Sequence, residues 1–286
     1  IDAGKMLLDA LNASSLLDTD NKIDQIAVKI SGVGEAIIYR SGFGYNIGGG
    51  EIGIPGIRTQ GGTVDLDDSD VAITVSEAII TRGGDVSITG VRSFDSSSTD
   101  ILTTGDINYA SGLYKDGGDI TITTTANSGA ISTGELDASA DITAASAVSG
   151  AITVNADGIL TVSTINAKGA GSGAGGAVNL TGSEVRIGGT VNTSSVSGNG
   201  GVINVNGPAV IATADQILTT GLTAGDINFS STLNSDAITA RGLNVTAGTG
   251  NITFTGAIGN VNPLGALNVV SATNVTASST LDAASL

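Results

Sequence analysis

A short alternating motif recurs nine times along this chain: a glycine and one further residue are followed by an apolar, a polar and an apolar residue. The nine triplets are Val64–Leu66, Val86–Ile88, Ile120–Ile122, Ile152–Val154, Val178–Leu180, Ile203–Val205, Ile227–Phe229, Ile252–Phe254 and Leu267–Val269. Their first residues are 22, 34, 32, 26, 25, 24, 25 and 15 positions apart. Alternation with a period of two residues predicts a strand with one buried face. Recurrence about every 25 residues predicts that each structural repeat contains this strand once, as in a solenoid.

The composition favours a narrow, stacked core. Aromatic residues make up only 3% of the 286 residues, whereas hydrophobic residues reach 40% and are mostly Ala, Val, Ile and Leu. A compact globule of this size would normally contain more large rings. The 43 glycines and 3 prolines indicate many tight corners and few kinks. A chain rich in glycine and serine is sometimes disordered, but a disordered chain lacks such regularly spaced β-branched residues.

Further short apolar segments between the triplets favour a parallel β-helix with two or three strands per coil. Examples are Leu160–Val162, Val185–Ile187 and Leu243–Val245. A β-sandwich would also alternate, but its strands differ from one another and are commonly joined by hairpin turns. The repeats here are alike, and Asn-Gly and Asp-Gly dipeptides are few. The chain is therefore predicted to be an all-β protein, a parallel β-solenoid.

Two regions are expected: residues 1–60, which do not follow the repeat, as an N-terminal cap or subunit-docking region, and residues 61–286 as the repeats. In the first region we expect a short helix over Ala3–Leu11, capped by Asp2. Strands are expected over Gln25–Ile30 and Glu35–Arg40. The glycine-rich stretch Gly42–Gly56 is expected to form a junction.

The charge and the missing residue types exclude several functions. The formal net charge is −16, with 27 acidic and 11 scattered basic residues. Such a chain binds nucleic acids and anionic membranes poorly, and no apolar run is long enough for a transmembrane helix. The absence of Cys and His removes the usual catalytic triads, so we do not expect an enzyme. The chain starts without Met and ends within the repeat pattern, so we expect a processed protein or part of a longer one.

Several segments together resemble a known family. They are GGDVSITG, GGDITIT, GGAVNLTG, GGVINVNG and TGNITFTGAIG, the last followed by Pro263–Val269. These segments resemble the repeats of filamentous-haemagglutinin-type exoproteins, which are large bacterial surface adhesins. The resemblance covers about residues 61–286. It implies a right-handed parallel β-helix that is secreted or displayed at the cell surface and serves in adhesion, aggregation or surface coating. The family's secretion domain carries an N-terminal Asn-Pro motif, to which Asn262–Gly265 is only a near match at the wrong end.

One acidic cluster is a candidate metal site. Asp65, Asp67, Asp68 and Asp70 are close in sequence, and alternate carboxylates at a turn are suitable calcium ligands. The alternative is a solvated turn, because the glycine-rich nonapeptide of calcium-binding β-rolls is absent. A second group of oxygen ligands, Asp18, Asp20, Asn21 and Asp24, departs from the EF-hand loop. No other cofactor is expected.

The middle residues of the triplets form a predicted outward column. They are Asp65, Ser87, Thr121, Thr153, Asn179, Asn204, Asn228, Thr253 and Asn268. Stacked Thr and Asn side chains either satisfy one another along the solenoid or present a polar stripe to a glycan or partner. We expect the first arrangement.

The expected function is that of a structural extracellular β-solenoid: a segment of a surface adhesin, or the subunit of a surface filament assembled end to end. The segment Leu267–Leu286 alternates without an evident cap, so it is predicted to pair with a following subunit or to continue into more coils. One alternative is a glycan-binding module, with a site formed by the loops at about 91–118 and 124–150. Another is a polysaccharide-cleaving enzyme, which would require two Asp residues and a Lys or Arg in one groove.

Overall fold

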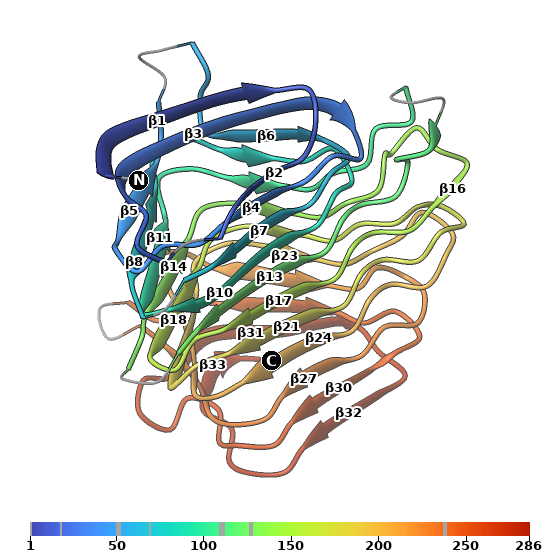
Figure 1. The fold of residues 1–286 in the computed structure, drawn as a ribbon. Helices are drawn as coiled ribbons and strands as arrows, with labels where there is room; N and C mark the ends of the chain where they lie inside the picture. Colours follow the sequence, from blue (N-terminus) through green and yellow to red (C-terminus); the bar gives the residue numbers. More distant parts are fainter. Residues whose placement is uncertain are drawn as a thin grey trace.

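A computed structural model describes residues 2–17, 19–49, 53–68, 70–108, 112–125, 128–236 and 239–286. These residues contain no α-helix, and their strands stack as a parallel β-solenoid (Figure 1). The all-β prediction is confirmed. A typical coil contains β17 (Ile152–Asn155), β18 (Ile159–Val162) and β19 (Ile165–Asn166) in succession.

Strands that begin successive coils form one 11-stranded parallel sheet in the described part of the chain. In order, they are β2 (Ser14–Leu16), β4 (Ile37–Tyr39), β7 (Val64–Asp67), β10 (Val86–Val91), β13 (Ile120–Thr124), β17, β21 (Val178–Thr181), β24 (Ile203–Asn206), β27 (Ile227–Phe229), β30 (Asn251–Phe254) and β32 (Asn274–Ala277).

The remaining faces belong to a second, 20-stranded sheet. One series comprises β1 (Asp2–Ala10), β3 (Lys22–Val33), β5 (Tyr45–Ile47), β8 (Ala72–Val75), β11 (Ser93–Ser96), β14 (Ile131–Thr133), β18, β22 (Glu184–Ile187), β25 (Ala209–Ile211) and β28 (Leu233–Ser235). The other comprises β6 (Ile57–Gln60), β9 (Ile79–Ile80), β12 (Ile101–Leu102), β15 (Leu136–Asp137), β19, β23 (Val191–Asn192), β26 (Gln216–Thr219), β29 (Leu243–Thr246), β31 (Leu264–Ser271) and β33 (Ala283–Ser285). A short antiparallel pair, β16 (Ser146–Ala147) and β20 (Ala170–Gly171), lies outside these series.

Equivalent branched residues lie directly over one another, as the triplets predict. Ile120 is the register partner of Ile152, and the column continues through Val178, Ile203 and Ile227. Eight of the nine triplets occupy the 11-stranded sheet in this way. The prediction is wrong for the ninth triplet, Leu267–Val269. This triplet lies in β31, which pairs with β29 in the other sheet. The next position above Ile252 is Val275 of β32.

The predicted N-terminal helix is also wrong. Asp2–Ala10 forms β1, which runs parallel to β3 and pairs with it from Asp2 to Ala10. Met6, Leu8 and Ala10 point toward the core cluster, whereas the intervening Leu7 is exposed. The segment thus also has strand periodicity, and the free edge of β3 stabilises that conformation over the helix.

Stacking begins well before residue 61. Strand β4 pairs in register with β7, so that Ile37 lies under Val64. The predicted strands over Gln25–Ile30 and Glu35–Arg40 lie at β3 and β4, and the glycine-rich stretch contains β5. The described residues among 2–60 therefore contribute the first coils to the same stack, with β1 and β3 at one end of the molecule (Figure 1).

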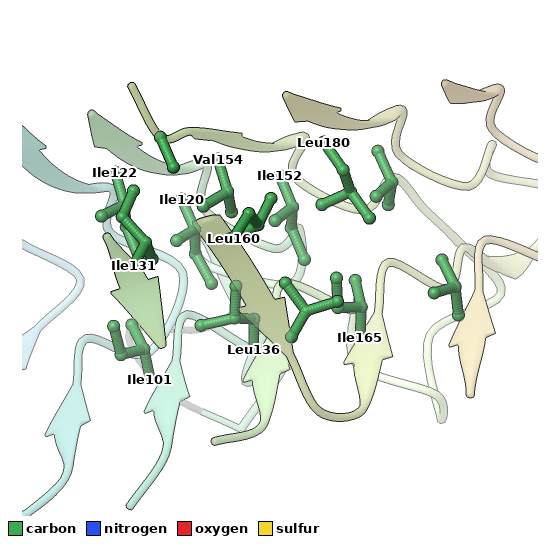
Figure 2. Packing of buried hydrophobic residues seen from close by; sticks show 14 of the residues in the cluster. Ile101, Ile120, Ile122, Ile131, Leu136, Ile152, Val154, Leu160, Ile165 and Leu180 are labelled. Carbon is green, nitrogen blue, oxygen red and sulfur yellow. The ribbon is translucent and has the colours of Figure 1, made fainter. Parts of the chain in front are cut away.

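The core is a continuous column of Ile, Val and Leu side chains between the faces. Figure 2 shows Ile120, Ile152 and Leu180 facing Leu136 and Ile165 across the interior. Most of the core residues are fully buried. Rings appear in the column only at intervals, as at Phe229 and Phe254, which stack with centroids 5.2 Å apart. Because each aliphatic side chain packs on its equivalents above and below, few aromatic residues are needed.

The glycine before most of the triplets is required by close backbone approach. A Cβ atom added at Gly118 would collide with the carbonyl group of Gly84, and one at Gly150 would collide with that of Gly118. The same corner buries hydroxyl groups that donate to glycine carbonyl oxygens. These hydrogen bonds include Thr103 to Gly118 (2.5 Å), Thr193 to Gly201 (2.6 Å) and Thr220 to Gly225 (2.8 Å). Each buried hydroxyl is thereby satisfied at the turn into the next coil.

Both wide intervals between triplets hold insertions at this same corner. One insertion follows β12, and its described residues are 103–108 and 112–119. The other follows β15 and contains β16. The sheet keeps its register across both, because Val86 pairs with Ile120 and Ile120 with Ile152. The loops expected at about 91–118 and 124–150 are therefore shorter than predicted, because β11 and β12 occupy part of the first range and β14 and β15 part of the second.

Candidate functional site

Three carboxylates of the predicted calcium cluster form ion pairs with arginines from neighbouring coils. Asp65 lies 3.1 Å from Nη2 of Arg40, and Asp67 lies 3.6 Å from Nε of the same guanidinium. Asp70 pairs with Arg92 at 3.3 Å. These side chains thus neutralise two arginines rather than converging on a common point.

The fourth carboxylate, Asp68, is fully buried. It accepts hydrogen bonds from the backbone N–H of Ser41 and from the hydroxyl of Tyr45, the latter at 2.6 Å. Burial raises the pKa of Asp68 to about 6, against the opposing effects of these two hydrogen bonds and of Arg40. Burial, together with the nearby Asp68 carboxylate, also raises the pKa of Tyr45 well above its ordinary value. Asp68 therefore connects the turn to the coil below it.

The geometry gives no support to a calcium site at this turn. Within the described ranges, no group of three or more Asp, Glu, His or Cys residues is arranged to hold a metal ion. In the second oxygen cluster, Asp18 lies outside the described residues. Asn21 is buried, and its carbonyl oxygen accepts a hydrogen bond from Ser41 Oγ at 2.8 Å. Calcium binding at Asp65–Asp70 remains a prediction from the sequence alone.

The outward column forms a satisfied ladder where it consists of asparagine. The side-chain amide of Asn204 donates to Asn179 at 2.8 Å, and that of Asn228 donates to Asn204 at 3.0 Å. A second ladder joins Asn268 to Asn244 at 3.0 Å. These amides hydrogen-bond along the axis, as expected, which leaves fewer polar groups free for a ligand.

The C-terminal coil leaves core positions uncovered. Val275 is 51% exposed, although its register partner Ile252 is fully buried. Leu281 bridges to the buried Ile258 and is 38% exposed. Within the described residues, β32 pairs only with β30, and β33 pairs only with β31. Residues 242–286 contain one charged side chain, Asp282.

A groove of about 610 Å³ follows the flank of the solenoid at the corner that carries the insertions. It is lined by Asp137 and by residues 104–105, 139–142, 168–169 and 194–196, which come from four neighbouring coils. Backbone hydrogen bonds of 2.9 to 3.0 Å connect these segments, from Gly105 to Ser139, from Ala140 to Lys168 and from Gly169 to Ser194. Both wide loops contribute to the groove, as the glycan-binding alternative expected. Two regular coils complete it.

The groove gathers two carboxylates and one ammonium group. Asp137 accepts a hydrogen bond from the backbone N–H of Ser139 at 2.9 Å. Asp141 accepts hydrogen bonds from Thr143 and from the backbone N–H of Ile107. Burial is the largest single influence and raises the pKa of Asp141, but the three hydrogen bonds together outweigh it, so the pKa lies below its ordinary value. Two Asp residues and a Lys in one groove is the combination that a polysaccharide-cleaving enzyme was expected to require.

Lys168 and Ser194–Val196 were not among the predicted site residues. The unusual intervals indicated only the two insertions. Lys168 and Ser194–Val196 lie in coils of ordinary length, and only the register places them beside the longer coils. A column of turn residues at this corner was the available signal, since Asp137, Asn166 and Asn192 are successive register partners.

Comparison with known proteins identifies no relative. No family model matches the chain, and neither the curated proteins nor the solved structures include a significant match. Among the described residues, none belongs to a helix of the length and hydropathy needed to cross a membrane.

Proposed function

We propose that this chain is a structural β-solenoid of the cell surface: a segment of an extracellular adhesin, or the subunit of a filament that assembles end to end. The observation that carries the proposal is the continuous parallel stack, in which successive coils pair in register along the whole described solenoid. Exposed strand edges are usually protected by charge, proline or a covering element. Here the last described coil exposes Val275 and Leu281 among neutral polar residues and carries one charge, so little opposes pairing with another strand of the same kind.

The long parallel stack also supports a scaffold role. Each coil contributes the same buried residues and the same backbone pairing, so length is added without a new fold. The resemblance of segments such as GGDVSITG to surface exoproteins supports an extracellular setting.

The test is association of the purified chain at increasing concentration, followed by light scattering and negative-stain electron microscopy. We expect association through the C-terminal coil and rods at high concentration. Val275→Lys places a charge on this edge, and Leu7→Lys places the same charge on β1 at the opposite end. Because an end-to-end filament joins these two ends, each variant should abolish the rods. A protein that stays monomeric and forms no rods would contradict the filament. Equal loss with Leu7→Lys would mean that both ends take part, as in head-to-tail assembly.

A further inference from the structure

Lys168 differs from most basic residues of this acidic chain. Seven of the 11 basic side chains form ion pairs between described residues: Lys29, Arg40, Arg82, Arg92, Lys115, Arg186 and Arg241. The structure gives the ammonium group of Lys168 no ion pair or hydrogen bond with any described residue. This group lines the flank groove, where it offers up to three hydrogen-bond donors to a ligand.

The neighbouring polar groups supply acceptors and further donors. Only one oxygen of Asp137 is used within the described structure, by the backbone of Ser139. Ser139 Oγ accepts from the backbone N–H of Lys168 at 3.2 Å and keeps its own proton available. The hydroxyls of Thr104 and Ser194 make no hydrogen bond with a described residue. The groove thus presents both kinds of partner that a hydroxyl group needs.

Two large apolar side chains complete the surface. Ile142 is 76% exposed and Val196 is 73% exposed, and both line the groove. Pyranose rings carry hydroxyl groups at their edges and C–H groups on their faces, which matches this mixture of polar floor and aliphatic wall. The volume of about 610 Å³ lies within the range of sites that enclose small ligands.

Charge decides between classes of saccharide. The chain carries a net charge of −16, and the groove contains Asp137 and Asp141 against Lys168. A polyanionic ligand would be repelled over a long range and again at the site. A neutral ligand avoids both penalties. We infer that the flank groove binds a neutral, hydroxyl-rich saccharide, with Lys168 as donor and Asp137 as acceptor.

The register indicates how the saccharide lies. The groove crosses four coils, which are stacked about 4.8 Å apart along the axis. An extended oligosaccharide parallel to the axis therefore reaches groups from several coils. This site does not depend on the proposed end-to-end assembly, because it lies on the flank.

The groove is a binding site rather than a cleavage site. Hydrolysis of a glycosidic bond requires a protonated carboxylic acid beside the leaving oxygen. Asp141 is poorly placed to supply that acid, because both of its oxygens already accept hydrogen bonds from Thr143 and Ile107. Asp141 is thus a structural residue of the loop.

The test begins with an array of neutral linear oligosaccharides of about four to eight units, together with oligogalacturonates of similar length. The strongest neutral ligand is then titrated calorimetrically into the intact chain and its variants. We expect Lys168→Ala to weaken binding at least tenfold, because a hydrogen bond from a charged donor is lost. Asp137→Asn should also weaken binding, yet the turn should be kept, since Asn192 accepts from Ser194 N at 2.9 Å in the same way. Lys22→Ala, in the first coils, is the matched control and should bind normally.

Several outcomes would overturn the inference. These are an array without a neutral ligand, tighter binding of oligogalacturonate, or unchanged affinity in both groove variants while circular dichroism shows them folded. Release of shorter products would overturn the assignment as binding only. Loss of rods with saccharide binding retained would reject the filament and leave the groove intact.

Discussion

At the N-terminal end, β1 lays Met6 and Leu8 over the first coil, and eight of the first 30 residues are charged. At the C-terminal end, Val275 and Leu281 are half-exposed, and Asp282 is the single charged side chain after residue 241. Both ends of a parallel stack expose an edge strand, but only charged or covered edges resist pairing. The comparison indicates that the described C-terminal edge is less protected by charge and by packing than the N-terminal edge.

The largest expected effect is a difference in the free energy of unfolding between a substitution in a covered coil and one in the last described coil. Ile252→Ala should lower the free energy of unfolding by about 2–5 kcal/mol, because it leaves a cavity beneath β32. Val275→Ala, one coil further, should cost less than about 1 kcal/mol because this side chain is already half-exposed. Urea unfolding of the two variants measures the difference. Equal losses would mean that the C-terminal coil is covered in solution.

The second prediction concerns pH at the N-terminal coils. The pKa of Asp68 is about 6 in the fold and about 3.8 in its unperturbed state, so the folded state holds its proton more tightly. The contribution to stability is therefore greatest at low pH and falls as pH rises through about 4 to 6. The loss amounts to at most about 3 kcal/mol.

Asp68→Asn isolates this contribution from other carboxyl groups. Relative to the parent chain, the variant should gain up to about 3 kcal/mol between pH 4 and pH 7.5. Hydrogen exchange should place the change in β5 and β7, while β30 amides stay constant. Asp67→Asn, at an exposed neighbour, is the control. A pH-independent difference between Asp68→Asn and the parent would show that Asp68 ionises normally.

The smallest effect compares the two asparagine ladders. Asn204 hydrogen-bonds both to Asn179 and to Asn228, so Asn204→Ala should cost about 1 kcal/mol. Asn268, near the C-terminal end, has only Asn244 as its ladder partner among described residues. Asn268→Ala should therefore lower the free energy of unfolding by only a few tenths of a kcal/mol. Thermal unfolding of both variants measures this. A larger cost at Asn268 would indicate an additional partner at the open end.

The sequence predicted what depends on local periodicity. Eight triplets stack as expected because a β-branched residue at each inward position suits only one register. The ninth triplet does not join the column, because β31 has the same alternation on another face. Its interval of 15 residues is shorter than all the others and was the available indication. The segment over Ala3–Leu11 is compatible with both helix and strand, and only pairing with β3 decides between them.

The candidate sites were less predictable because they depend on neighbours from other coils. Asp65 and Asp68 are three residues apart, yet one meets Arg40 at the surface and the other meets Tyr45 inside. The alternation does place Asp68 in phase with the buried Val64 and Leu66, but it does not show that Tyr45 and Ser41 from another coil satisfy the buried carboxylate. The groove likewise arises from segments that are about 30 residues apart in sequence, such as the turns at Asp137 and Lys168.

The shared corner of the two insertions has a practical consequence. Extra residues after β12 and β15 leave the pairing of Ile120 with its neighbours unchanged. Foreign peptides grafted into either loop should therefore be displayed outward without loss of the scaffold. Because the two loops belong to adjacent coils, two grafted epitopes would be held one coil apart at a fixed spacing, which suits multivalent presentation.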